Sequence, residues 1–90
     1  MRVLEISKKS TKFILKLGEK QRKQIVLKIN SLTLHPFPND SIKLLGADSF
    51  YRVDIGEYRI IYQANSDFLK VFIVEKRNDD DVYRKFSRLI

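Results

Sequence analysis

The segment FYRVDIGEYRIIYQ, residues 50–63, decides the fold, because it predicts a β-hairpin with two chemically different faces. Gly56-Glu57 is a Gly-X pair between two runs rich in β-branched and aromatic residues, which is typical of a two-residue type II′ turn. Such a turn fixes which residues lie opposite each other, and side chains along a strand alternate between its faces. One face is then apolar, with Ile55 opposite Tyr58, Val53 opposite Ile60 and Tyr51 opposite Tyr62.

The second face of the hairpin is charged. By the same register, Asp54 lies opposite Arg59, Arg52 opposite Ile61 and Phe50 opposite Gln63. Cationic groups are therefore expected on a sheet surface instead of a solvated loop. We expect the functional site of the protein to lie on this face.

Length, charge and cysteine content limit the classes of protein. The 90 residues predict a single domain, residues 1–90, and the net charge of +7 favours a polyanionic partner, nucleic acid before membrane. Many small basic domains, however, carry such charge only for solubility. With no Cys and one His, neither a disulfide framework nor a metal site is expected, and no cofactor is predicted. The chain has no long apolar window and no signal-peptide pattern at its first residues, so we expect a cytoplasmic protein without a membrane span.

The rest of the chain predicts helices and strands around the hairpin. We expect a strand over 2–6 and a first helix that is capped by Ser7 and stopped by Gly18. A longer helix then starts at Glu19, buries a stripe of Ile25, Ile29 and Leu32, and ends at His35-Pro36. Residues 37–49 have no clear period and are expected to form an irregular connection. Residues 69–74, LKVFIV, predict a strand buried on both faces. Three aspartates at 79–81 then favour the start of a last helix.

The predicted fold class is α+β, with the order β-α-α-β-β-β-α. A mainly antiparallel sheet packs against an αα-hairpin, and a C-terminal helix follows. The double-stranded RNA-binding domain shares part of this order, but its last helix begins with lysines where this chain has aspartates that would repel phosphates. An RRM has a different order and needs a basic-aromatic motif that this chain lacks on a central strand.

The combination of YRVDIGEYRIIYQ, a buried strand and KRNDDDVYR, preceded by KLLG at 43–46, resembles the RelE/ParE family of type II toxin–antitoxin toxins. The resemblance covers almost the whole chain. It implies a ribosome-dependent mRNA endoribonuclease of the RelE kind, in which a ribose 2′-hydroxyl attacks the adjacent phosphorus without a metal. It also implies a cognate acidic antitoxin, and therefore a toxin–antitoxin hetero-oligomer, as a partner besides the ribosome and mRNA.

The resemblance assigns catalytic roles to three residues. Arg59 falls at a phosphate-binding arginine, and Arg77 at the arginine that stabilises the transition state or protonates the leaving oxygen. Tyr83 falls at the tyrosine that stacks on or orients the substrate nucleotide. Arginine suits phosphate because its fork of donors matches phosphate oxygens and stays charged.

Four further residues belong to the predicted site. Arg52 falls at a basic residue beside the substrate, and Lys43 and Lys76 are further candidates for substrate binding. Asp54 departs from the family, whose strongly catalytic members have a lysine there, and it is a possible modulator of activity. An aspartate cannot stabilise an anionic transition state.

Simpler interpretations remain open for the same residues. Arg59 and Asp54 fit an ordinary cross-strand ion pair, Tyr83 fits packing beside Val82 and Phe86, and Arg77 fits a tether to Asp79 or Asp80. At the level of the protein, the alternative is a ParE-like DNA gyrase inhibitor or a catalytically weak antitoxin-binding member. Asp54 favours that alternative.

Overall fold

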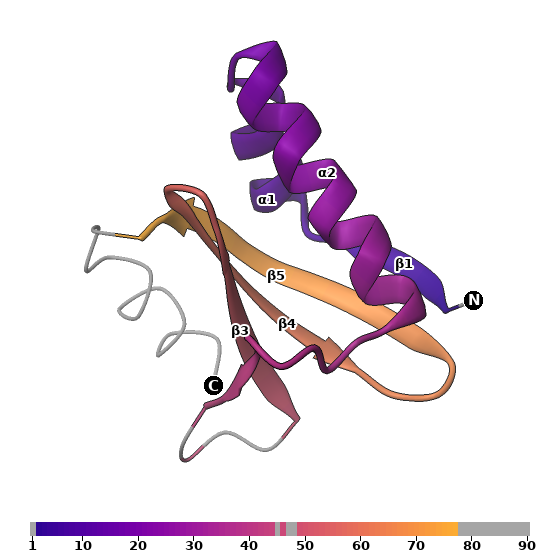
Figure 1. Ribbon diagram of the computed structural model, residues 1–90. Coiled ribbons are helices and arrows are strands. Elements are labelled where there is room, and N and C mark those ends of the chain that lie inside the picture. Colours follow the sequence, from indigo (N-terminus) through magenta and orange to yellow (C-terminus); the bar gives the residue numbers. More distant parts are fainter. Residues whose placement is uncertain (1, 45, 47–48, 78–90) are drawn as a thin grey trace.

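The structure is a computed structural model and describes residues 2–44, 46 and 49–77. Its elements, in chain order, are β1 (Val3–Ile6), α1 (Lys8–Leu15), α2 (Glu19–Leu34), β2 (Ile42–Lys43), β3 (Phe50–Ile55), β4 (Tyr58–Ala64) and β5 (Phe68–Lys76). Both helices lie on one face of a twisted sheet (Figure 1). Neither helix in these ranges is long and apolar enough to cross a membrane. The predicted C-terminal helix, with the aspartates at 79–81, lies outside the described residues.

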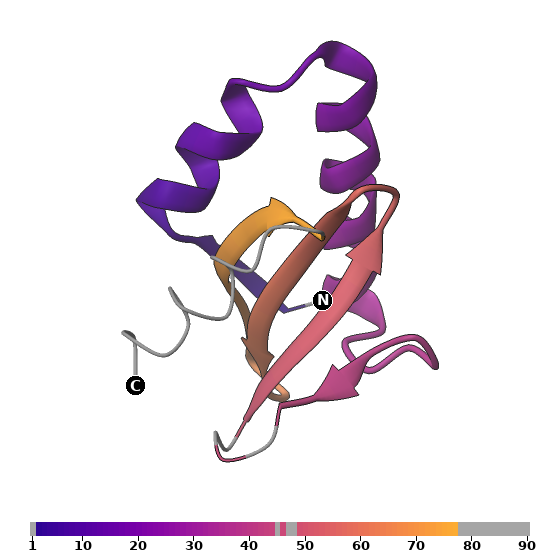
Figure 2. The same ribbon diagram turned by 90° about the vertical axis from the view of Figure 1, so that its left-hand side faces the viewer.

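The sheet has five strands in the order β1-β5-β4-β3-β2. The neighbours β5, β4, β3 and β2 pair antiparallel, whereas β1 pairs parallel with β5. The first strand of the chain therefore lies beside the last described one. The predicted α+β class, a mainly antiparallel sheet packed against an αα-hairpin, is confirmed, and Figure 2 shows the two helices as an antiparallel pair above the sheet.

The hairpin of β3 and β4 has the predicted register. All six predicted pairs are present, from Phe50 opposite Gln63 at the open end to Ile55 opposite Tyr58 at the turn. Gly56 has a φ of 57°, and Ser49 is the only non-glycine with positive φ in the described part of the chain. A positive φ at the first turn residue alone is what a type II′ turn requires.

The main core lies between the helices and the sheet. The predicted stripe of α2 is buried there, with exposed fractions of 0% for Ile25, 1% for Ile29 and 0% for Leu32. Ser7 caps α1 as predicted: its Oγ accepts a hydrogen bond from the backbone N–H of Ser10 (3.1 Å) and donates one to the Phe72 carbonyl of β5 (2.8 Å). The same side chain thus starts the helix and attaches it to the sheet.

A bulge in β5 supplies apolar side chains to both faces of the sheet. Ile61 lies opposite Ile73, but Tyr62 lies opposite Val71, so Phe72 is an extra residue in β5. Val71 packs in the helix-covered core, whereas Ile73 packs with Phe50 and Ile61 in a second cluster on the other face. The prediction that this strand is buried on both faces is confirmed.

Two predictions about the connections were wrong. Residues 37–49 were expected to be irregular, but Ile42 and Lys43 form β2, which pairs with β3. A strand of two residues has no periodicity that a sequence pattern could reveal. Gly18 was expected to end the first helix, but α1 ends at Leu15, and Gly18 is instead the N-cap of α2 with an ordinary φ of −62°.

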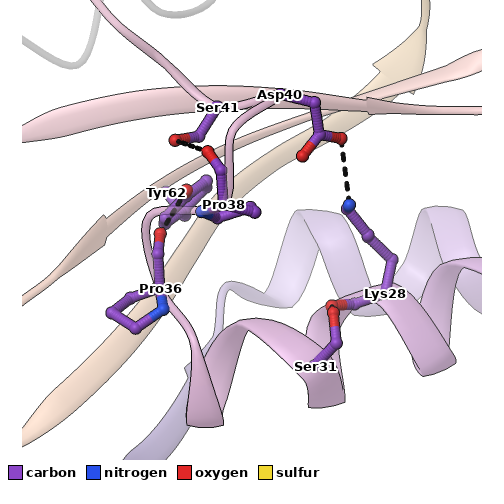
Figure 3. Close-up of polar contacts among 7 residues, drawn as sticks. All are labelled: Lys28, Ser31, Pro36, Pro38, Asp40, Ser41 and Tyr62. Atoms are coloured by element: carbon purple, nitrogen blue, oxygen red, sulfur yellow. Dashed lines mark hydrogen bonds and ion pairs between the residues drawn. The ribbon is translucent and has the colours of Figure 1, made fainter.

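Polar contacts of Tyr62 and its surroundings hold the segment between α2 and β2 (Figure 3). The buried Tyr62 hydroxyl donates a hydrogen bond to the Pro36 carbonyl (2.6 Å), and Ser41 Oγ donates one to the Pro38 carbonyl (2.8 Å). Lys28 Nζ on α2 lies 3.0 Å from Asp40 Oδ2. Burial raises the pKa of Tyr62 from 10.0 to about 12.

The raised pKa of Tyr62 predicts that the folded state loses stability at alkaline pH. The neutral phenol stabilises the folded state fully below pH 10.0, and that contribution is lost as the pH rises toward 12, because the unfolded chain releases the proton first. Tyr62→Phe should lower the free energy of unfolding by about 1 kcal/mol near neutral pH, through the lost hydrogen bond. The difference between parent and variant should then narrow above pH 10.0. Urea unfolding of both proteins, monitored by circular dichroism from neutral pH to above pH 10.0, measures the difference in the free energy of unfolding. A difference that stays constant with pH would contradict the prediction.

Candidate active site

A hollow of about 390 Å³ lies beside the turn between β3 and β4. It is lined by Gly56, Glu57, Arg59, Lys76 and Arg77. Three of the residues predicted for the site therefore share one concave surface: Arg59 comes from β4, and Lys76 and Arg77 come from the end of β5. A smaller, mostly apolar hollow of about 150 Å³ lies between the start of α1 and β5, and none of the predicted site residues lines it.

The carboxylate of Asp54 is the point on which two arginines converge. Arg59 Nε lies 2.8 Å from Asp54 Oδ1, and Arg59 Nη2 lies 3.4 Å from Oδ2. Arg77 Nε approaches Oδ2 at 3.5 Å. The cross-strand ion pair that the register made possible is thus present, and it extends to a second guanidinium group from the end of β5.

The pKa of Asp54 is lowered, chiefly by its hydrogen bonds with Arg59. Partial burial acts in the opposite direction, and the charges of Arg59, Arg77 and Arg52 lower the pKa further. The carboxylate stabilises the fold above its ordinary pKa of 3.8, and this contribution is lost as the pH falls through the lowered value. Asp54 is therefore ionised at neutral pH and is a weak base.

The hairpin turn positions Arg77. The backbone N–H of Arg77 donates to the Glu57 carbonyl (2.7 Å), and its Nη1 donates to the Gly56 carbonyl (3.2 Å). A Cβ at Gly56 would lie 2.9 Å from Nε2 of Gln24, so α2 packs closely on this turn, which also has positive φ. Helix α2 therefore supports the hairpin turn, and the turn holds Arg77 next to Asp54.

Solved structures of known proteins share this fold. No protein-family model and no curated protein matches the sequence. The structure is similar to the archaeal RelE–RelB complex from Pyrococcus horikoshii, with 26% identity, 86% of this chain and 96% of that chain covered, and a TM-score of 0.75. The chain is RelE-like.

Two further solved structures agree with this result. A mutant of the E. coli toxin RelE in the free state covers 99% of this chain and 97% of its own, with a TM-score of 0.80 and 24% identity. The RelB–RelE antitoxin–toxin complex from Methanococcus jannaschii covers 91% and 98%, with a TM-score of 0.69 and 26% identity. The similarity to these RelE structures therefore covers 91% or more of this chain.

In this RelE-like chain, Arg52 and Glu75 border the arginine pair. Arg52 lies two residues before Asp54 on the same face of β3, and its charge contributes to the lowered pKa of Asp54. Glu75 of β5 lies directly opposite Arg59. No sequence pattern pointed to Glu75, because its place beside Arg59 depends on the register of β4 with β5 after the bulge.

Three predicted site residues that the structure describes, Lys43, Arg52 and Asp54, do not line the hollow of the RelE-like chain, although Asp54 contacts two arginines that do. Lys43 lies opposite Tyr51, and paired residues share a face, so its side chain lies on the helix-covered side of the sheet. Tyr83 lies outside the described residues, as do Asp79 and Asp80, the partners considered for Arg77. Within residues 2–44, 46 and 49–77, no three His, Asp or Glu side chains gather where they could hold a metal ion.

Proposed function

We propose that this chain is the toxin of a type II toxin–antitoxin system and that it cleaves mRNA on the ribosome. The observation that carries the proposal is the convergence of Arg59 and Arg77 on one anionic group beside a hollow. The similarity to RelE toxins over almost the whole chain supports it. The proposed target places the protein in the cytoplasm.

The proposed reaction is an intramolecular transesterification of the RNA backbone. The ribose 2′-oxygen forms a bond to the adjacent phosphorus and loses its proton, while the bond to the 5′-oxygen breaks and that oxygen gains a proton. Negative charge builds on the phosphate oxygens in the transition state, and the forked donors of Arg59 and Arg77 are suited to stabilising it. Arg52 and Lys76 would bind the substrate beside them, and Tyr83 would orient the nucleotide.

The described residues supply positive charge better than they supply a base. Arginine keeps its proton at all accessible pH values. Asp54, with its lowered pKa, accepts a proton poorly at neutral pH, whereas an efficient general base has a pKa near the working pH. The contribution of this hollow to catalysis is therefore electrostatic.

A cognate antitoxin is the proposed protein partner. The RelE chains of Pyrococcus horikoshii and Methanococcus jannaschii are in complexes with RelB. The net charge of +7 would attract an acidic protein that covers the basic surface and keeps the toxin inactive in a hetero-oligomer. Failure of the purified chain to bind the antitoxin encoded beside it would contradict this part of the proposal.

Mapping RNA ends tests the nuclease. The chain is expressed without an antitoxin, and new 5′ ends are mapped in cells and in a reaction of purified chain with translating ribosomes. We expect cuts at fixed positions within codons that occur only when ribosomes translate the message. DNA damage without mRNA cleavage would instead support the gyrase-inhibitor alternative.

A further inference from the structure

We propose that Asp54 is an internal anion that occupies the place of a phosphate group between Arg59 and Arg77, so that a phosphate binds by replacing the carboxylate. The proposal rests on the proposed function only in naming RNA as the source of that phosphate. The binding site itself is inferred from the geometry of the described residues.

The contacts of Asp54 are those that a phosphate would make. One carboxylate oxygen faces Arg59 Nε at 2.8 Å, and the other lies 3.4 Å from Arg59 Nη2 and 3.5 Å from Arg77 Nε. Carboxylate and phosphate oxygens are recognised by the same forked guanidinium geometry. A phosphate and this carboxylate cannot both occupy the space between the two arginines, because their charges repel and they need the same donors.

The two arginines are held to different degrees. The Arg59 side chain is 14% exposed, whereas that of Arg77 is 53% exposed and lies farther from the carboxylate. The backbone and side-chain hydrogen bonds of Arg77 to the hairpin turn do not involve Asp54. An incoming phosphate therefore meets Arg77 at the open side of the hollow first and reaches Arg59 only when the carboxylate moves aside.

A purely structural ion pair would behave differently. Removing the charge of such a pair lowers stability and leaves anion binding unchanged or weaker, because the arginines are no longer held in place. An internal competitor has the opposite effect on binding, since its removal frees donors for the ligand. The direction of the change in phosphate affinity therefore separates the two roles.

The test is to titrate the parent chain and the variant Asp54→Asn with inorganic phosphate. Binding is monitored through the NMR signals of the arginine Nε–H groups at low salt, where screening is weak. We expect Asp54→Asn to bind phosphate about fivefold more tightly, the scale of one partly exposed charge interaction. Asp54→Ser, with a smaller neutral side chain, should change the affinity in the same direction. Thermal unfolding confirms that each variant is folded.

Asp40→Asn is the matched control. It also removes one negative charge from an ion pair, that of Asp40 with Lys28 at 3.0 Å. Lys28 does not line the hollow, whereas Arg59 and Arg77, the partners of Asp54, do. We expect the phosphate affinity of Asp40→Asn to equal that of the parent. Unchanged or weaker binding by both Asp54 variants, or an equal gain in Asp40→Asn, would overturn the proposal.

Parallel assays of mRNA cleavage separate this inference from the proposed function. Tighter phosphate binding by Asp54→Asn without cleavage by any variant would leave the internal anion standing and refute the nuclease. Cleavage by the parent without tighter binding in Asp54→Asn would refute the internal anion and leave the nuclease standing.

Discussion

Replacing Arg77 with alanine is expected to lower the rate of mRNA cleavage on translating ribosomes by about 10²- to 10³-fold, the usual cost of losing one donor that stabilises a transition-state anion. The Arg77 side chain lies 3.5 Å from Asp54 and donates to the Gly56 carbonyl at 3.2 Å, and these two contacts orient it beside the hollow. Its alanine variant loses the guanidinium group and leaves the turn intact. Single-turnover cleavage of a short message on stalled ribosomes measures the change.

Two variants control this experiment. Arg77→Lys keeps the charge but loses the fork of donors, and it should retain only part of the activity. Arg22→Ala removes an arginine of α2 that does not line the hollow, and its cleavage rate should match that of the parent. Cleavage by Arg77→Ala at the rate of Arg22→Ala would refute the role proposed for Arg77.

The largest effect on stability is expected from Leu32→Ala. Leu32 is 0% exposed and packs in the core between α2 and the sheet. The substitution should lower the free energy of unfolding by about 3–5 kcal/mol, because it removes buried methyl groups and leaves a cavity. The total stability of small domains is about 5–15 kcal/mol, so the variant loses a large part of it.

Leu27→Ala provides a matched comparison for this second prediction. Leu27 lies on the same helix and is 61% exposed. Its replacement should change the free energy of unfolding by about 0.5 kcal/mol or less. Urea unfolding of both variants, followed by circular dichroism, measures the difference. Equal losses would show that α2 does not pack on the sheet through Leu32.

The hairpin and the helix stripe could be predicted because their causes are local. A two-residue turn at Gly56-Glu57 leaves one register, and each pair from Phe50–Gln63 to Ile55–Tyr58 followed from it. Ile25 and Ile29 recur one turn apart, so their burial followed from helical spacing alone. The pair of Asp54 and Arg59 could be predicted for the same reason as the rest of the hairpin.

The features that escaped prediction depend on long-range contacts. β2 has two residues, and the extra residue in β5 at Phe72 follows no pattern in the sequence. The resemblance to a family assigned Arg59 and Arg77 to one site, but the contact of Arg77 with Asp54 was not predicted, since no local rule places the end of β5 beside the hairpin turn. The hydrogen bond from Arg77 to the Gly56 carbonyl left no signal in the sequence, because any residue supplies a carbonyl.

The parallel pairing of β1 with β5 has a consequence for synthesis of the protein. In the part of the chain that the structure describes, β1 pairs only with β5, and residues 68–71 of β5 supply its partners. A nascent chain must therefore leave its first strand unpaired until residues 68–71 have been translated. Arg77 follows directly after β5, so the strand that pairs with β1 and the second arginine of the hollow are synthesised one after the other.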